Sequence, residues 1–152
     1  MIEGLRSSPG DRPQASRSFP NDDAALRPLS DWFREFARDN GIAAARALDF
    51  ELCLNEVVTN IIHYAYADRG EHEIRITLES DGEELRATVE DDGRPFNPLD
   101  KEPPAIPDSL GDARVGGWGI PIVRAFADGL FYERRDGRNR FTILSRERSP
   151  AS

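Results

Sequence analysis

The stretch "NEVVTNIIHYAY", residues 55–66, decides how the chain is interpreted. Its apolar residues recur at helical spacing and predict a helix over residues 45–67 whose apolar stripe packs on a sheet. Glu56, Asn60 and His63 are spaced i, i+4 and i+7, so they share a narrow polar surface nearly opposite that stripe. The stretch therefore poses the question of what three polar residues do inside an apolar helix.

Two interpretations of this polar surface are open. It can be a solvated face, as on most helices, or it can be the floor of a cleft. Leu52 and Cys53 border it where a solvated face would carry Lys, Arg and Glu, which favours the cleft. There, the Glu56 carboxylate could orient a nucleophile while the Asn60 amide oxygen holds a hard cation, as phosphoryl transfer needs. Alone, the pattern E-x-x-x-N is a weak signal, because many helices contain it by chance.

Composition excludes several classes of protein. At 152 residues the chain fits one domain. Its net charge of -8 lacks the basic footprint of a nucleic-acid or anionic-membrane binder. Cys53 is the single cysteine and makes no zinc spacing with His63 and His72, so a reducing cytoplasm fits best. No apolar run approaches 18 residues and the N-terminus lacks a hydrophobic signal region, so neither secretion nor membrane spanning is expected.

The remaining segments predict helices layered on one face of a mainly antiparallel sheet, an α+β fold. Trp32, Phe33 and Phe36 share one sector of the first helix, where we expect them to be exposed. In chain order we expect a flexible tail (1–17), a helix (25–41), the helix 45–67, a hairpin around Asp81-Gly82, a long connection (93–116) that is a lid or disordered, a short helix from "GIPIVRAFADG" (119–129), a hairpin around Asp136-Gly137 and a C-terminal tail (147–152).

Two further motifs follow the long helix. "VEDDGRPFNP" ends a strand with Asp91 and then Gly93, where a carboxylate can accept from an exocyclic amine while glycine admits a flat ring. A plain turn after a strand is the alternative. "VGGWGIPIV" places glycines at the start of the last helix, where free N–H groups can meet phosphate oxygens; a flexible hinge is the alternative there. No Gly-Lys-Ser/Thr occurs, so a nucleotide site would not be a P-loop.

Taken in order, the three motifs resemble the N, G1 and G2 boxes of the GHKL ATPases. Within that superfamily they are most similar to the small bacterial anti-sigma-factor serine/threonine kinases, over about residues 18–146. The resemblance implies a single ATP-binding kinase domain over 18–146, folded as a two-layer α/β sandwich with a mixed, mainly antiparallel sheet. It places ATP between the long helix and the lid 93–116.

The resemblance also assigns site residues. It makes Asn60 the Mg²⁺ ligand, Glu56 the general base for a protein serine hydroxyl, Asp91 the acceptor for the adenine amine and Gly93 its neighbour. It implies ATP and Mg²⁺ as cofactors, with the metal shielding the triphosphate from nearby carboxylates. His63 is expected to be structural.

Other positions match less cleanly. Gly117 and Gly119 match the phosphate-proximal glycines, while Trp118 between them is bulkier than the usual aliphatic residue. Arg114 or Lys101 could supply the lid cation that meets the terminal phosphate, although surface charge is an alternative role for each.

Two more departures concern the adenine side of the site. Pro95 stands where many relatives have a second glycine. The usual threonine that supports the adenine-binding aspartate has no clean counterpart; Thr142 is nearby but out of register.

The function implied is an anti-sigma factor that holds a sigma factor and phosphorylates an antagonist protein. Homodimers are also expected, and neither a nucleic acid nor a membrane is expected as a direct partner. A nucleotide-gated binding module without kinase turnover is the alternative. An ATPase piece of a larger sensor is a third possibility.

Overall fold

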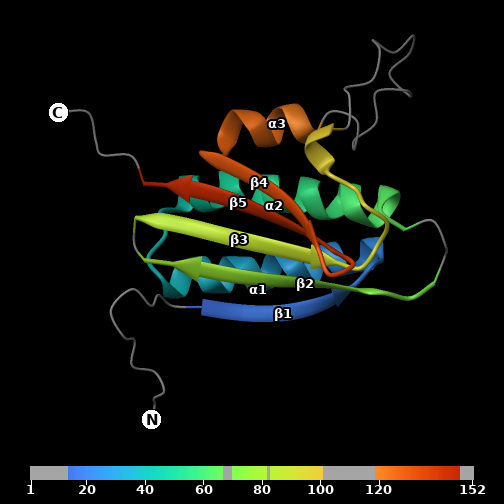
Figure 1. Ribbon diagram of the computed structural model, residues 1–152. Coiled ribbons are helices and arrows are strands. Elements are labelled where there is room, and N and C mark those ends of the chain that lie inside the picture. Colours follow the sequence, from blue (N-terminus) through green and yellow to red (C-terminus); the bar gives the residue numbers. More distant parts are fainter. Residues whose placement is uncertain (1–13, 67–69, 82, 101–118, 148–152) are drawn as a thin grey trace, which may run out of the picture.

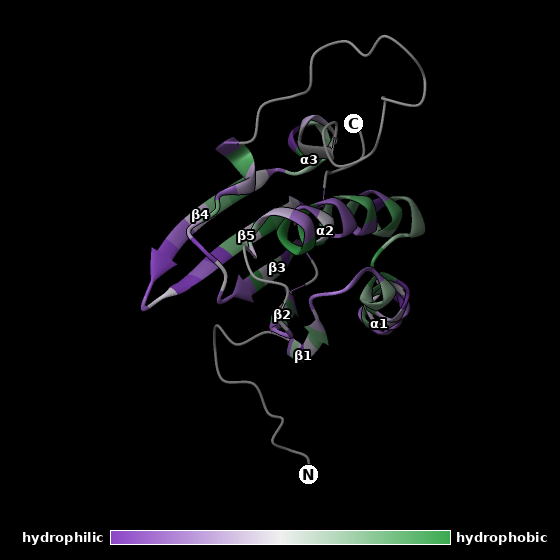
Figure 2. Cartoon of the chain, turned by 90° about the vertical axis from the view of Figure 1, so that its right-hand side faces the viewer, coloured by the Kyte–Doolittle hydropathy of each residue, from purple (hydrophilic) through white to green (hydrophobic). Residues whose placement is uncertain are grey.

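The computed structural model describes residues 14–66, 70–81, 83–100 and 119–147. A twisted sheet forms one layer, and α1, α2 and α3 lie on the same side of it (Figures 1 and 2). Along the chain the elements are β1 (Gln14–Pro20), η1 (Asp23–Ala25), α1 (Leu26–Asp39), α2 (Ala44–Tyr64), β2 (Glu73–Ser80), β3 (Glu84–Asp91), η2 (Pro98–Asp100), α3 (Gly119–Phe126), β4 (Gly129–Arg135) and β5 (Arg138–Arg146).

The described strands form one five-stranded sheet in the order β1-β2-β3-β5-β4, and every neighbouring pair is antiparallel. The predicted α+β class and two-layer sandwich are confirmed. In the part of the chain that the structure describes, the sheet is wholly antiparallel rather than mixed. The turn between β4 and β5 holds Asp136 at φ 53° and Gly137 at φ 77°, as a two-residue hairpin requires. This tight turn fixes the register between β4 and β5, in which Arg134 pairs with Asn139.

The predicted N-terminal tail is wrong for residues 14–17, because they belong to β1, which pairs with β2 at the edge of the sheet. In β1 Phe19 is buried while its neighbours are exposed or half-buried. The strand therefore lacks the alternation by which a strand is recognised in a sequence.

The core lies between the sheet and the helices. Alternate residues of β2 and β3 point into it, and so does the apolar stripe of α2, of which Leu54, Val58, Ile61 and Ala65 are buried. On its other flank, α2 is tied to α1 by a bidentate ion pair in which Arg34 donates to Glu51, with both N···O distances 2.8 Å. In the described ranges, no helix has both the length and the apolarity needed to cross a bilayer.

The expectation of an exposed aromatic sector on the first helix is wrong. Phe33 is fully buried and stacks on Phe50 of α2 with ring centroids 5.4 Å apart, and Phe36 is only 8% exposed. Trp32 is half-buried against Phe19 at 5.5 Å. The aromatic surface is therefore covered by α2 and by β1, the strand that the sequence did not reveal.

Candidate functional site

The C-terminal end of α2 meets the loop that follows β3. A Cβ built on Gly93 would lie 2.4 Å from the carbonyl oxygen of Ala65, closer than any side chain tolerates. Next to it, the backbone N–H of Arg94 donates to that same oxygen at 2.8 Å, and Arg94 Nε donates to the carbonyl of Tyr64 at 2.9 Å. The loop thus satisfies carbonyls at the end of α2 that have no partner within the helix. Glycine at 93 allows the contact.

Asp91 is the last residue of β3 and is fully buried. Its Oδ1 accepts from the backbone N–H of Gly93 at 2.9 Å and from Nδ2 of Asn139 at 2.8 Å. Its Oδ2 is buried without a hydrogen-bond partner among the described residues. Burial raises the pKa of Asp91, and the hydrogen bonds from Asn139 and Gly93 partly offset this rise. One oxygen is therefore fixed by the protein and the other is left as an acceptor for a ligand.

Asn60 and Glu56 lie one turn apart on α2. Asn60 is fully buried, yet neither its Oδ1 nor its Nδ2 has a partner among the described residues. Glu56 is half-buried, its Oε1 is likewise without a partner, and burial raises the pKa of its carboxyl. The solvated-face interpretation is therefore wrong for Asn60. A buried polar atom without a hydrogen-bond partner costs about 1–3 kcal/mol of stability. Such atoms in a native protein therefore indicate a position where a ligand or a water molecule binds.

His63, the third residue of the predicted polar surface, does not join this pair. Its Nε2 lies 2.9 Å from Oδ1 of Asp23, in the segment that leads into α1. Its side chain is 44% exposed, unlike that of Asn60. The local hydrogen bond agrees with the structural role that we expected for it.

The partner of Asp91 is Asn139, a residue that the sequence analysis missed, and not Thr142. Asp91 and Asn139 are direct cross-strand partners, so their side chains leave the sheet on the same face. Thr142 lies three residues further along β5, pairs with Thr88 and points to the opposite face. No local signal in the sequence gives this pairing, because the register between β3 and β5 joins segments 48 residues apart.

The remaining predicted site residues are placed only in part. Gly119 is the first residue of α3, and α3 packs against α2. Gly117, Arg114, Lys101 and Trp118 lie outside the described residues.

The residues that are described fit a magnesium-nucleotide complex. No cluster of three or more His, Cys, Asp or Glu side chains that could hold a metal occurs in the described ranges, so a fully protein-made cage is absent there. Magnesium in phosphoryl-transfer sites takes few protein ligands and completes its shell with phosphates and water. The unpartnered amide oxygen of Asn60 can supply such a single oxygen ligand.

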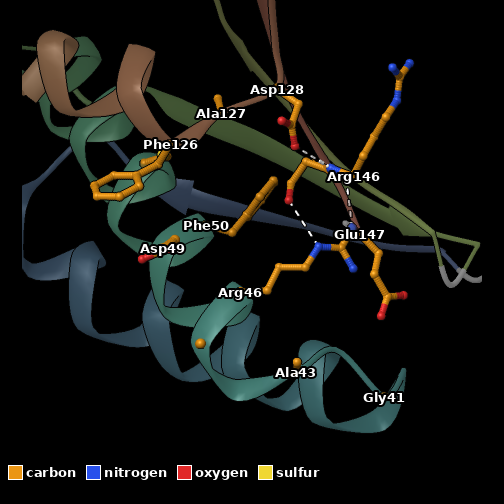
Figure 3. Close-up of a pocket in the computed structure, with 13 residues that line it drawn as sticks. Gly41, Ala43, Arg46, Asp49, Phe50, Phe126, Ala127, Asp128, Arg146 and Glu147 are labelled. Carbon is orange, nitrogen blue, oxygen red and sulfur yellow. Dashed lines mark hydrogen bonds between the residues drawn. The ribbon is translucent and has the colours of Figure 1, made fainter. Parts of the chain in front are cut away.

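A cavity of about 370 Å³ lies at the other end of α2 (Figure 3). It opens between the first turns of α2, the end of α3 and the end of β5, and Asp49, Phe50, Cys53 and Phe126 are among its lining residues. None of the motif residues that the structure describes lines it. We therefore place the candidate site at the C-terminal end of α2, where the loop after Asp91 contacts the helix, and not at this cavity.

Comparisons with known proteins point to one family. The family model described as the histidine kinase-like ATPase domain matches residues 19–144. The chain is 31% identical over 114 residues to the serine/threonine-protein kinase BtrW of Bordetella bronchiseptica, which covers 75% of this chain and 80% of that protein. It is 38% identical over 81 residues to blue-light-activated histidine kinase 2 of Erythrobacter litoralis, which covers 52% of this chain and 20% of that protein.

A solved structure gives the same picture of the fold. The crystal structure of the RsbU and RsbW domains of Rv1364c from Mycobacterium tuberculosis matches with a TM-score of 0.61 at 20% identity. The match covers 91% of this chain and 34% of that one, so this chain spans about a third of that protein.

Proposed function

Because the chain belongs to the histidine kinase-like ATPase family, we propose that it binds ATP with Mg²⁺ and phosphorylates a serine or threonine of a partner protein. The observation that carries the proposal is the pair on α2: a fully buried Asn60 amide that has no partner among the described residues, one turn from a half-buried Glu56. The naming of a relative at 31% identity as a serine/threonine-protein kinase supports the choice of reaction.

Each residue would have a distinct task. Asn60 Oδ1 would hold the metal, which when bound neutralises charge on the phosphate oxygens. Glu56 would accept the proton of the substrate hydroxyl. The hydroxyl oxygen would form a bond to the terminal phosphorus as the bond between that phosphorus and the ADP oxygen breaks. Asp91 would accept the exocyclic amine of adenine. Burial raises the pKa of Glu56 toward neutral pH, and a carboxylate with a higher pKa is a better proton acceptor.

Phosphate contacts would come from the start of α3. Gly119 begins this helix, and backbone N–H groups at a helix start carry the positive end of its dipole. Gly117, together with Arg114 from the lid, would complete the contacts by the resemblance described above.

The biological setting is also proposed from that resemblance. The protein would act in the cytoplasm as an anti-sigma factor, hold a sigma factor, and phosphorylate the antagonist that competes for it. It would work as a homodimer, although the aromatic residues of α1 give no exposed patch for a dimer interface, because Phe33 and Phe36 are buried and Trp32 is half-buried. Light scattering that gives only the monomer mass at high micromolar concentration would contradict the dimer.

The test uses the intact chain, ATP with Mg²⁺ and the antagonist encoded nearest to it. Glu56→Gln keeps the shape of the side chain and should keep ATP affinity, but lower phosphorylation by roughly 10²–10⁴-fold, because proton acceptance is lost. Asn60→Ala should instead weaken Mg-ATP binding itself. Mass spectrometry of the antagonist gives the first result and calorimetry the second.

The outcomes separate the candidate functions. Undiminished phosphorylation by Glu56→Gln would remove the proposed mechanism. ATP binding without phosphoserine or phosphothreonine product, even in the wild type, would identify a nucleotide-gated binding module. No ATP binding at all would reject both.

A further inference from the structure

Asn139 is a buried carboxamide at the start of β5, and it joins that strand to the loop after β3. Its Nδ2 donates two hydrogen bonds, to Oδ1 of Asp91 and to the carbonyl oxygen of Arg94, both at 2.8 Å. An amide nitrogen has two protons, so its donor capacity is fully used. The side chain therefore holds both the carboxylate of β3 and the backbone three residues further along.

The other end of the same amide is held just as firmly. Oδ1 of Asn139 accepts from the Tyr132 hydroxyl at 2.6 Å, from the backbone N–H of Phe96 at 3.1 Å and from Arg134 Nη1 at 3.2 Å. The same Arg134 nitrogen donates to the carbonyl oxygen of Gly93 at 2.8 Å. Two side chains of β4 thus clamp Asn139 from behind.

These contacts fix which way the amide points. An amide flip would turn NH₂ toward the N–H of Phe96 and the guanidinium of Arg134, which can only donate. The flip would also turn the amide oxygen toward the carboxylate of Asp91, which when ionised can only accept. The network therefore enforces a donor toward Asp91 and leaves no second orientation.

The consequence for Asp91 is directional. Its Oδ1 is occupied by two N–H donors, from Asn139 and from Gly93, so rotation of the carboxylate would break both bonds. Its Oδ2, which is buried and has no partner in the described ranges, is the oxygen left for a ligand. An ionised carboxylate oxygen accepts hydrogen bonds but cannot donate, so it favours an amine over a carbonyl at that edge of a base.

We propose that Asn139, clamped by Tyr132 and Arg134 of β4, is a positioning residue that aims the free oxygen of Asp91 at the 6-amino group of the purine. The clamp thereby sets the selectivity of the site for adenine. This inference rests on the proposed function, in that it requires a purine nucleotide next to Asp91. It adds that residues of β4 and β5, outside the three motifs, decide which base is accepted.

The test compares two nucleotides that differ only in the amine. Calorimetry with Mg²⁺ measures the affinities of ATP and of purine riboside triphosphate, which lacks the 6-amino group, on the full chain. Wild type should prefer ATP by roughly ten- to a hundredfold, the effect of one hydrogen bond to a charged group. Asp91→Asn sets the floor, with little or no preference left.

The variants then report on the clamp. Asn139→Ala should reduce the preference for ATP at least about fivefold, and Tyr132→Phe, which removes a single hydroxyl and keeps the ring packing, should reduce it about two- to threefold. Thr142→Ser, on the same strand but the opposite face, is the matched control and should leave the preference unchanged. Thermal melting of each variant checks that it is folded, and Tyr132→Phe remains informative if Asn139→Ala is not.

The outcomes are distinguishable. If Asn139→Ala and Tyr132→Phe weaken both nucleotides equally, so that the preference is unchanged, their role is only structural and the inference is overturned. If wild type binds neither nucleotide, the proposed function fails and the inference fails with it. If wild type binds both equally, nucleotide binding survives but the selectivity assigned to Asp91 and its clamp is refuted.

Discussion

The two ends of α2 are built from the same helix but treat their polar groups in opposite ways. At the N-terminal end, Arg46 donates to Oγ and the carbonyl oxygen of Ser145 and to the carbonyl oxygen of Glu83, at distances of 2.7–3.1 Å. At the C-terminal end, the amide of Asn60 is fully buried with no partner among the described residues, and one oxygen of Asp91 is in the same state.

The difference teaches how to separate a structural site from a functional one. The N-terminal end borders a well-formed cavity, yet Arg46, the cation there, already donates three hydrogen bonds and joins the helix to the sheet. The C-terminal end carries groups that find no partner in the described ranges, and such groups destabilise the fold unless something else satisfies them. A cavity alone does not indicate which ligand it binds. A buried polar atom without a hydrogen-bond partner indicates whether the ligand should donate or accept a hydrogen bond there.

The largest expected effect comes from adding a side chain at Gly93, where the loop after β3 approaches the end of α2. Gly93→Ala would push a methyl group against the Ala65 carbonyl, so the loop must shift and Asp91 must lose its bond from the Gly93 N–H. We expect ATP affinity to fall more than about a hundredfold, the equivalent of about 3 kcal/mol. Calorimetry measures it.

Gly41→Ala, just before α2, is the matched control. Gly41 has φ 70°, so alanine there is strained by about 1–2 kcal/mol, but its Cβ would meet nothing within 4 Å. The control should lower stability and leave ATP affinity within about twofold. Equal binding losses in both variants would mean that general destabilisation, not the close approach at Gly93, is responsible.

At the N-terminal end we expect a loss of stability without a loss of binding. Arg46→Met keeps the apolar stem but removes the bonds to Ser145, which is buried, and to the carbonyl oxygen of Glu83, which is exposed. Urea unfolding should show a decrease of about 1–3 kcal/mol in the free energy of unfolding. A fall in ATP affinity at a temperature where the variant is folded would erase the contrast between the two ends.

The smallest effect should appear at Glu56, and its sign is a gain. Burial raises the pKa of this carboxyl in the folded protein, so the folded state binds the proton more tightly than the unfolded state. Stability contributed by the protonated form is therefore lost as pH rises from the unfolded pKa through the raised folded pKa.

Glu56→Gln removes the free-energy cost of burying the ionised carboxylate. Because the carboxyl is only half-buried and partly screened by water, we expect the variant to be more stable than wild type at neutral pH by no more than about 0.5 kcal/mol. The gain should vanish at a pH below the unfolded pKa. Thermal melting from acid to neutral pH measures it, and a variant less stable than wild type at neutral pH would contradict the pKa direction.

The sequence predicted most of the fold because the signals were local. Short-range signals in the sequence indicated the helix around Glu56, the helix that ends before Asn40 and the pairing of β2 with β3. They also predicted the last hairpin with its Asp136-Gly137 turn, because periodicity and turn chemistry act within short windows. The strand β1 escaped because an edge strand with one buried residue, Phe19, carries no alternation, and its pairing with β2 is set across more than fifty residues.

The candidate site could be predicted only in its motifs. Glu56 and Asn60 share a helix, so their spacing alone places them together, and Asp91 and Gly93 belong to one turn. Asn139 lies 48 residues beyond Asp91, and only the sheet register brings the two together. The burial of Phe33 likewise depends on its contact with Phe50 of α2, which the periodicity of the first helix alone does not indicate.

The pairing of Asn139 with Arg134 across the last hairpin has a consequence for how this chain can change over time. In a strand, consecutive side chains alternate between faces, so one residue inserted between the Asp136-Gly137 turn and Asn139 would turn the amide away from Tyr132 and Arg134 of β4. Sequence drift in that hairpin can alter the chemistry of its exposed positions freely, except at Arg134, which contacts Asn139. It cannot alter their number, so among descendants of this sequence the length of the last hairpin should be inherited more faithfully than its composition.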